Sequence, residues 1–389
     1  MRFQEIVGHN KLKNRLINSV LNNRISHAQL FLGADGSEKL ALAIAYAQYI
    51  SCINKQVYPE NSEIIGDSCG SCPSCVKYQK LAHPDLHFIF PVANTKTVTN
   101  KPTSNQFLNE WREALINSNY YLSLNEWYQE INIENKQGKI GTDDANQIVK
   151  TLALKSYEGE YKVMIIWMIE KLYHSAAPKL LKILEEPPPK TLFILITEDT
   201  NDILKTILSR TQLVKVPPLE NEEIREYLYH NFQFNNDKVE TIVNLAEGNF
   251  KNATKYLLDN FDDHPYFSTF REMMLLAYNH DFGKIKSKSD QLSKIGRENI
   301  KQLLQYGLRI VRLCLYHDLG NTEMVKSNGN ELAFIQKFSR FVNRTNAEDI
   351  TNLLNEANFH ISRNVNPKIV IMDMLLKISQ IFGKKIIVI

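Results

Sequence analysis

Short, uninterrupted apolar runs alternate with amphipathic segments through the first 216 residues of the chain. Two of these runs, 163–167 and 192–196, are rich in β-branched residues, which is typical of strands buried on both faces. Between them, apolar residues recur every three or four positions from Ala177 to Leu184, which predicts a helix. Because strand and helix alternate, the pattern predicts parallel strands joined by crossover helices, and therefore an open α/β sheet.

Capping and helix-breaking residues set the expected limits of the helices in this region. Ser175 is placed to cap the first helix, and the prolines at 187–189 end it. Asn201 or Asp202 can cap the next helix, which we expect to run to residue 210.

The same periodicities organise the rest of the chain. In the N-terminal part we expect helices over 12–21 and 41–50 and strands over 27–32 and 86–90. After a strand over 212–216, the pattern predicts a small helical lid (220–229, 237–246 and 252–258) and then a wholly helical region (270–277, 300–315, 332–343, 347–362 and 367–382). We therefore expect three domains: an α/β domain over 1–216, a helical lid over 217–262 and an all-α domain over 263–389.

Composition places the chain among ordinary globular proteins. Its 389 residues are 43% apolar and 23% charged, which suits two or three domains with substantial cores. The net charge of +3 permits contact with nucleic acid but does not indicate it. Apolar runs stay well short of about eighteen residues and no signal-peptide pattern follows Met1, so we expect a cytoplasmic protein without membrane contact.

Four of the five cysteines form a pattern that predicts a metal site. Cys52 is followed by Cys69, Cys72 and Cys75, and the two-residue spacing lets neighbouring cysteines turn onto one ion. Four thiolates satisfy a tetrahedral zinc completely, so we expect a structural zinc, with Cys52 set apart by the longest interval. An iron–sulfur cluster, which usually takes its fourth cysteine from a different spacing, and four unconnected thiols are the alternatives. Cys314, alone in an apolar helix, is expected in a core.

Residues 92–139 differ in composition from the segments on either side. They are rich in Asn, Thr, Ser and Lys, and we expect an insertion in the α/β domain with one helix over 106–117 between loops. The insertion also holds five clustered aromatic residues: Trp111, Tyr120, Tyr121, Trp127 and Tyr128. Aromatic residues interleaved with basic ones can stack on single-stranded nucleic acid, but the interpretation we favour is that they anchor the insertion to its own domain.

The segment 33–40 lies where the first strand enters its helix, which is the position of a phosphate-binding loop. Gly33, Gly36 and Lys39 are candidate nucleotide contacts there. A working loop needs a glycine before the lysine and a hydroxyl after it, to hold phosphate and magnesium, yet the chain has Glu38 and Leu40. We interpret this segment as a turn without nucleotide; a degenerate site that holds nucleotide weakly is the alternative.

The end of the strand over 163–167 bears on the same site. Proteins that hydrolyse nucleoside triphosphates need acidic residues to hold magnesium and orient the attacking water. Trp167 and Met168 occupy the end of this strand, and the first carboxylate, Glu170, comes three residues after it. We expect Trp167 and Met168 to be packing residues and the chain to lack ATPase activity of its own.

A specific resemblance joins the region between the second strand and the last one. Residues 175–188 read Ser-Ala-Ala-Pro-Lys-Leu-Leu-Lys-Ile-Leu-Glu-Glu-Pro-Pro, and Ser209-Arg210-Thr211 follows. These motifs resemble the clamp-loader ATPase family of the AAA+ superfamily, most closely the delta-prime type of bacterial DNA polymerase III. The resemblance is sharpest over 174–210, extends to 27–90 and is weak in the C-terminal helices. It implies a zinc module over 52–75 and a helical collar that packs between subunits of a ring.

The resemblance also implies roles for single residues. Ser209 and Arg210 match the family's Ser-Arg-Cys motif, with Thr211 in place of its cysteine, so Arg210 is expected to act as an arginine finger on a neighbouring subunit. A helix-end arginine without this role is the alternative. Active relatives often have an arginine near the start of the last lid helix, where this chain has Lys251 or Asn252.

These observations favour a non-hydrolysing, delta-prime-type subunit of a heteromeric clamp loader. The resemblance implies gamma/tau-type ATPases and a delta-type subunit as partners, and a sliding clamp and primed DNA as what the complex acts on. One rival is an active gamma/tau-like ATPase subunit, which Glu38, Leu40, Trp167 and Met168 oppose. A second rival is a stand-alone zinc-bearing nucleic-acid-binding protein, which would need a basic stripe that the charge balance does not show.

Overall fold

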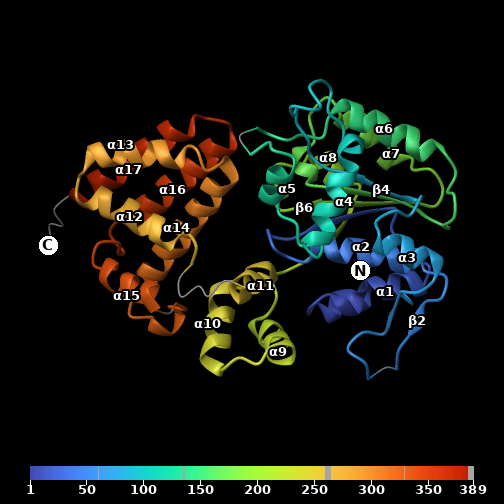
Figure 1. Cartoon of the computed structure of the whole chain (residues 1–389), viewed down its shortest axis with the longest axis horizontal. Coiled ribbons are helices and arrows are strands. Elements are labelled where there is room, and N and C mark those ends of the chain that lie inside the picture. Colours follow the sequence, from blue (N-terminus) through green and yellow to red (C-terminus); the bar gives the residue numbers. More distant parts are fainter. Residues whose placement is uncertain (60, 135, 259–263, 328, 384–389) are drawn as a thin grey trace. The chain divides into compact units, whose positions relative to one another are not determined.

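A computed structural model describes residues 1–383 of the chain except 60, 135, 259–263 and 328 (Figure 1). The chain divides into two compact units, each with its own hydrophobic core. The first unit contains Met1–Val239 and Ala246–Lys255, and the second contains Glu240–Leu245 and the residues from Tyr256 onward. The boundary expected between residues 262 and 263 lies outside the described residues, so the three-domain division stays a prediction.

The first unit is built on a five-stranded parallel sheet, which confirms the predicted open α/β arrangement. The strand order is β4-β5-β6-β1-β7, and each neighbouring pair is parallel. All residues of β5 and β6 are buried, which explains their nearly continuous apolar sequence. The strands are β1 (Ala28–Leu32), β4 (Leu86–Ile89), β5 (Lys162–Trp167), β6 (Thr191–Thr197) and β7 (Gln212–Lys215).

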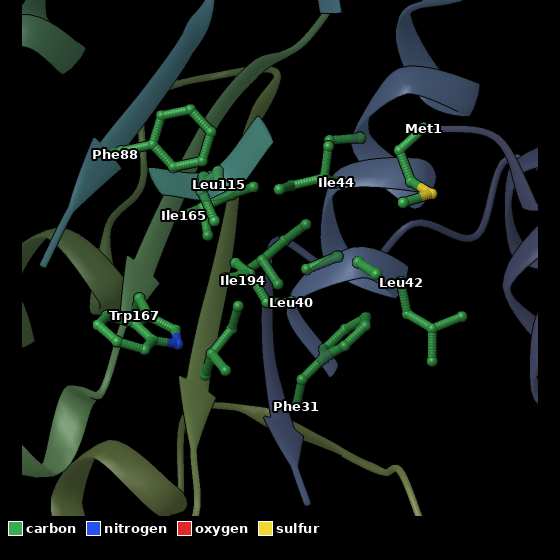
Figure 2. Close-up of a cluster of buried hydrophobic side chains, with 14 of the residues drawn as sticks. Met1, Phe31, Leu40, Leu42, Ile44, Phe88, Leu115, Ile165, Trp167 and Ile194 are labelled. Carbon is green, nitrogen blue, oxygen red and sulfur yellow. The ribbon is translucent and has the colours of Figure 1, made fainter. Parts of the chain in front are cut away.

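One face of the sheet packs against the N-terminal helices. Helix α2 (Lys39–Ser51) is buried from Lys39 to Ile50, and α1 (Asn10–Leu21) lies beside it. The apolar residues of α2 surround the helix instead of following one stripe, as in helices with neighbours on all sides. Figure 2 shows Leu40 and Ile44 of α2 in one apolar cluster with Ile165 and Ile194 of the strands.

The other face of the sheet is covered by α6 (Thr142–Ala153), α7 (Ala177–Glu185) and the short α8 (Lys205–Leu208). The expected cap of α7 was wrong. Ala176 stands at its N-cap, because the Ser175 hydroxyl instead hydrogen-bonds the Thr142 hydroxyl at 2.8 Å.

Helix α8 is shorter than the sequence predicted. Neither Asn201 nor Asp202 caps it, because the Asn201 amide donates to the Asp199 carboxylate at 2.9 Å in a local turn before the helix. The helix begins after Leu204 and ends before Ser209. Ser209 and Arg210 therefore lie in the connection between α8 and β7.

The insertion contains two helices, not one. A 3₁₀ turn (Ser104–Phe107) leads into α4 (Leu108–Asn117), and α5 (Leu124–Glu130) follows. The sequence analysis placed a loop at α5, which was wrong. The Glu126 amide donates to the Ser123 hydroxyl at 3.3 Å and the Ser123 amide to the Glu126 carboxylate at 3.0 Å, and this capping box starts the helix.

The remaining elements of the first unit are short. A 3₁₀ turn (Phe3–Glu5) opens the chain, and a second one (Ile169–Lys171) follows β5. The strands β2 (Gln56–Val57) and β3 (Gly66–Asp67) form a small antiparallel hairpin before α3 (Pro73–Gln79). The expected lid helices are α9 (Asn221–Asn231), α10 (Asn236–Ala246) and α11 (Phe250–Leu258), and α10 is divided between the two units.

The second unit is helical throughout its described residues, as the sequence predicted. Helix α13 was not expected, because only a few of its positions, such as Ile285 and Leu292, are apolar and buried. Cys314 is buried in this core. Among the described helices, none combines the length and apolar character needed to cross a membrane. The elements are α12 (Phe267–Tyr278), α13 (Phe282–Leu292), α14 (Arg297–Asp318), a 3₁₀ turn (Thr322–Met324), α15 (Gly329–Phe338), α16 (Ala347–Ser362) and α17 (Pro367–Gly383).

Candidate functional site

Lys39, the candidate phosphate-binding lysine, is engaged within its own loop. The loop 33–38 connects β1 to α2, and Lys39 is the first residue of α2. Its ammonium group donates a hydrogen bond to the Ala34 carbonyl at 2.7 Å and lies 3.5 Å from the Glu198 carboxylate, which follows β6. A phosphate-binding lysine must reach the phosphates of a nucleotide, whereas Lys39 is neutralised by the protein itself.

Glu38 lies fully buried beneath the same loop. Its Oε2 atom is 2.7 Å from His9 Nε2, and its Oε1 atom has no hydrogen-bond partner among the described residues. Burial raises the pKa of the Glu38 carboxyl, although the hydrogen bond with His9 opposes this shift. A carboxyl group thus stands where a phosphate-binding loop has a glycine, and its oxygens are acceptors that compete with phosphate oxygens for donors.

Asn249 fastens the start of lid helix α11 to the loop. Its side-chain amide donates to the Asp35 carbonyl at 3.0 Å, and its side-chain oxygen accepts from the Asn252 amide at 3.0 Å. Gly36 has a φ of +73°, and a Cβ placed there would lie 2.1 Å from the Asn249 side-chain oxygen. Gly36 is therefore needed for the approach of Asn249. A Cβ at Gly33 would similarly meet the Ser37 hydroxyl at 2.3 Å.

The end of β5 carries packing residues, as the sequence analysis expected. Trp167 and Met168 are 1% and 2% exposed. The Trp167 ring lies 5.0 Å from the Trp111 ring of the insertion, measured between centroids. Glu170 is buried instead of facing the loop 33–38 as a magnesium ligand would: it accepts a hydrogen bond from the Glu198 amide at 3.3 Å, and burial raises the pKa of its carboxyl.

Arg210 lies on the surface of the first unit, two residues after α8. Its guanidinium group pairs with Glu185 at the end of α7 and donates to the Thr206 carbonyl at 2.9 Å and the Ser209 hydroxyl at 3.3 Å. The side chain remains 33% exposed. It is therefore held against the surface and does not project freely, as the sequence had led us to expect.

Arg210 borders an open pocket of about 660 Å³ at this surface. The ion pair with Glu185 leaves one edge of the planar guanidinium group accessible from the pocket, which suits it to a second anionic partner. The residues that line the pocket are His27, Leu184, Glu185, Ser209, Arg210 and Thr211.

The structure brings together the four cysteines that the sequence singled out. Cys52 caps α2, Cys69 and Cys72 lie in the turn after β3, and Cys75 is in α3. The sulfur atoms of all four lie within 4.8 Å of one another. The Cys52 and Cys69 sulfurs are 3.6 Å apart, and those of Cys69 and Cys75 are 3.9 Å apart.

The donor set fits a tetrahedral metal ion. Four sulfurs around zinc, each about 2.3 Å from the ion, are separated by about 3.8 Å from one another, which is close to the two distances above. The backbone amides of Cys69, Cys72 and Cys75 donate to the sulfurs of Cys52, Cys69 and Cys72 at 3.3–3.5 Å. Such hydrogen bonds orient thiolate ligands, so these cysteines could hold a metal ion such as zinc.

Asp67 connects the cysteine cluster to the start of the chain. Its buried carboxylate accepts hydrogen bonds from the amides of Phe3 at 3.1 Å, Gln4 at 2.9 Å and Ser68 at 2.7 Å. Cys69 follows two residues later, and the Ser68 hydroxyl accepts from Gln48 of α2 at 2.9 Å. The turn that carries Cys69 is therefore fixed by both the N-terminal turn and α2.

Two insertion residues contact the lid, a role that the sequence analysis did not assign. Glu126 of α5 pairs with Lys251 of α11, and the Tyr121 ring lies 5.2 Å from the Phe250 ring. The Ser-x-x-Glu pattern at Ser123 was a signal for α5. The sequence held no signal for the pairing itself, since Glu126 and Lys251 are 125 positions apart.

Curated relatives of this chain are subunits of DNA polymerase III. The delta-prime subunit of Bacillus subtilis is 29% identical over 213 residues, which are 55% of this chain and 49% of that protein. The delta-prime subunit of Haemophilus influenzae is 26% identical over 75% of this chain and 72% of its own length. The tau/gamma subunit of H. influenzae is 24% identical over 64% of this chain, but the chain spans only 30% of it. The chain thus spans less than half the length of two of these three relatives.

Solved structures and a family model were also compared with the chain. A gamma-subunit-related protein of Thermotoga maritima covers 96% of the chain with a TM-score of 0.42 and 16% identity, a likeness too low to support an argument. The model of the family described as DNA polymerase III, delta subunit matches residues 8–220, more than half of the chain. On this match, the protein belongs to the DNA polymerase III delta subunit family.

Proposed function

We propose that this chain is a delta-prime-type subunit of a clamp loader that does not hydrolyse ATP itself and instead supplies Arg210 to the ATP site of a neighbouring subunit. The observation that carries the first half is the engagement of Lys39 with the Ala34 carbonyl and Glu198. To bind a nucleotide, the loop would have to release this ammonium group and accept phosphates near the buried Glu38.

Three further features support the absence of hydrolysis. Leu40 is buried where a magnesium-binding hydroxyl is required, and Trp167 packs on the insertion where hydrolysis requires an acidic residue nearby. The lysine near the start of α11, Lys251, is paired with Glu126 of the insertion. Each feature removes a different part of the machinery of phosphoryl transfer, so an active gamma/tau-like subunit is the less favoured alternative.

The second half of the proposal rests on Arg210. The residue is permanently charged, one third exposed and open to a surface pocket, so it can reach an anion on another subunit. A heterologous ring interface sets one surface of each subunit against a different surface of the next, which is how a finger can act in trans. Glu185 then has a simple role: it holds the guanidinium group in position until a phosphate replaces it.

The partners follow from the family and from the named relatives. We infer a heteromeric ring with gamma/tau-type ATPases and a delta-type subunit, which opens a sliding clamp and loads it onto primed DNA. Cys52, Cys69, Cys72 and Cys75 would hold one structural zinc within this subunit, since four protein thiolates leave no open position for catalysis.

Reconstitution with the partner subunits of the same cell tests this function. We expect the purified chain to show no ATP hydrolysis, and Lys39→Ala to leave the ATPase rate of the reconstituted loader unchanged within about twofold. The equivalent lysine substitution in the ATPase partner is the positive control. A steady ATPase rate from the chain alone that Lys39→Ala abolishes would overturn the proposal in favour of an active subunit.

A further inference from the structure

The insertion is fixed to the sheet by an aromatic cluster. The ring of Trp111 stacks on that of Phe90 at 4.2 Å between centroids and meets the Trp127 ring edge-on at 5.1 Å. The Trp127 indole donates to the Pro91 carbonyl at 2.8 Å, and both tryptophans are fully buried. Leu115 of α4 joins the cluster beside α2 and the strands (Figure 2). The base of the insertion is therefore as rigid as the core to which it belongs.

From this base, Tyr121 reaches the lid. Its ring packs 5.2 Å from that of Phe250, the first residue of α11, and the opposite contact of Phe250 is Tyr227 of α9 at 4.8 Å. Phe250 is 5% exposed, so it is enclosed between a lid residue and an insertion residue. The Tyr121 hydroxyl is buried without a described partner, and burial together with the nearby charge of Glu38 raises its pKa. Tyr121 thus lies on the same side of the unit as the loop 33–38.

Glu126 adds a charged contact next to the aromatic one. Its Oε2 atom accepts from the amide and the hydroxyl of Ser123, both at 3.0 Å, and also pairs with the Lys251 ammonium group. The helix cap fixes the direction of the carboxylate, so Lys251 meets an acceptor that is already in place. Phe250 and Lys251 are consecutive, and both therefore contact the insertion.

We propose that residues 121–126 form an internal clasp, which holds the start of α11 in one position over the loop 33–38 without any nucleotide. On the other side of this contact, Asn249 is bonded to the Asp35 carbonyl. Three consecutive residues, 249–251, are thereby held between the loop and the insertion. In a nucleotide-driven lid the ligand itself supplies the bridge between these parts, and here protein groups supply it.

The clasp has a consequence that is separate from catalysis. A lid whose closed position depends on ligand contacts moves when the ligand leaves, because only the difference in contacts between the two states shifts the equilibrium. The clasp contributes contacts that do not change with nucleotide. The inference concerns only the position of the lid, and it holds whether or not Arg210 acts as a finger.

Hydrogen exchange of the full-length chain, with and without magnesium-ATP, tests the clasp. The variants are Glu126→Lys, Lys251→Glu and the double variant that exchanges the two charges. Glu130→Lys, an exposed charge reversal on the same helix α5, is the matched control. We expect each single reversal to raise the exchange rate of peptides that cover 249–255 by roughly two- to fivefold, the range of a partly exposed ion pair. The double variant should return to within about twofold of the unmodified protein.

A second pair of variants tests the aromatic contact. Tyr121→Ala should raise exchange in the same peptides by about tenfold or more, because it removes a packed ring, whereas Tyr121→Phe should have little effect because the hydroxyl has no described partner. The clasp would be refuted if the single reversals matched Glu130→Lys. It would also be refuted if magnesium-ATP slowed exchange over 249–255 in the unmodified chain as strongly as the reversals speed it.

Discussion

The side chain of Asn249 occupies the space beside Gly36 that any other residue at position 36 would need for its Cβ. The distance from that Cβ position to the Asn249 side-chain oxygen is 2.1 Å, while the Asn249 amide binds the Asp35 carbonyl. Gly36 was a candidate phosphate contact from the sequence. In the structure its lack of a side chain serves an internal contact of the protein with its own lid.

Gly36→Ala should therefore destabilise the first unit more than backbone strain alone explains. The positive φ costs about 1–2 kcal/mol for alanine, and the clash with Asn249 should bring the loss in unfolding free energy to about 2–4 kcal/mol. Gly320→Ala is the matched control, since Gly320 has a φ of +76° with open space around it. Denaturant unfolding measures both, and equal losses for the two variants would show that the Asn249 contact contributes nothing.

Arg210→Ala should lower DNA-stimulated ATP hydrolysis and clamp loading by the reconstituted complex. Arginine fingers contribute roughly 10³–10⁵ in rate at the site they serve, and total turnover should fall by the share of that one site. Arg210→Lys should restore little, because a point charge cannot replace the planar fork. Folding should change by less than about 1 kcal/mol, since only a half-exposed ion pair with Glu185 is lost.

Lys205→Ala controls for the loss of a positive charge near Arg210, because Lys205 is exposed on the adjacent helix α8. Loading at the unmodified rate by Arg210→Ala would leave Arg210 as a helix-end charge only.

Metal analysis of protein purified without chelator should find one zinc per chain. Cys69→Ser should lower the zinc content and reduce the unfolding free energy of the first unit by several kcal/mol, because structural zinc contributes about 10–16 kcal/mol in small zinc-finger peptides. Cys314→Ser, which removes a buried thiol in the second unit, should leave the zinc content unchanged. Iron in place of zinc would favour the iron–sulfur alternative.

Acid should weaken the first unit through Asp85. Burial alone would raise the pKa of this carboxyl, but the amides of Tyr157, Glu158 and Gly159 donate to it at 2.6–2.8 Å and lower its pKa below the ordinary 3.8. The unfolded chain then binds the proton more readily than the folded one, so stability is present above about pH 4 and is lost as the pH falls through the folded-state pKa.

Asp85→Asn should lower the unfolding free energy by about 1.5–3 kcal/mol at pH 7, the range for hydrogen bonds to a charged group. The difference from the unmodified protein should shrink toward pH 3. Asp143→Asn, at an exposed helix start with no resolved pKa shift, is the comparison variant. A gap between Asp85→Asn and the unmodified protein that stays constant with pH would contradict the assigned cause.

The sheet and the cysteine cluster followed from local sequence, whereas the lid contacts did not. Strands β5 and β6 are buried on both faces, so their apolar runs are visible in any short window. Helix α5 was missed because it has seven residues and only its capping box distinguishes it from a loop. The pairings Trp111–Trp167 and Glu126–Lys251 join segments far apart in the chain, and hydrophobic periodicity carries no information about such partners.

The position of Arg210 shows the same limit from another side. The sequence predicted a helix end and a motif, and both are present, but it contained no indication that Glu185 would hold the guanidinium group. An ion pair at the surface depends on how two elements meet, here the ends of α7 and α8. Motif recognition locates such a residue, and only three-dimensional structure shows its partner.

The hydrogen bonds of Asp67 make the cysteine turn and the N-terminal turn a single cooperative piece. Asp67 binds the amides of Phe3 and Gln4 and lies two residues before Cys69. Losing the metal would therefore loosen residues that coordinate nothing, and the Phe3 ring, fully buried against α2, would lose its anchor. Zinc occupancy, by this route, becomes a checkpoint for the maturation of the whole α/β layer during synthesis: an apo chain would expose apolar surface to chaperones and proteases at a place remote from its thiols.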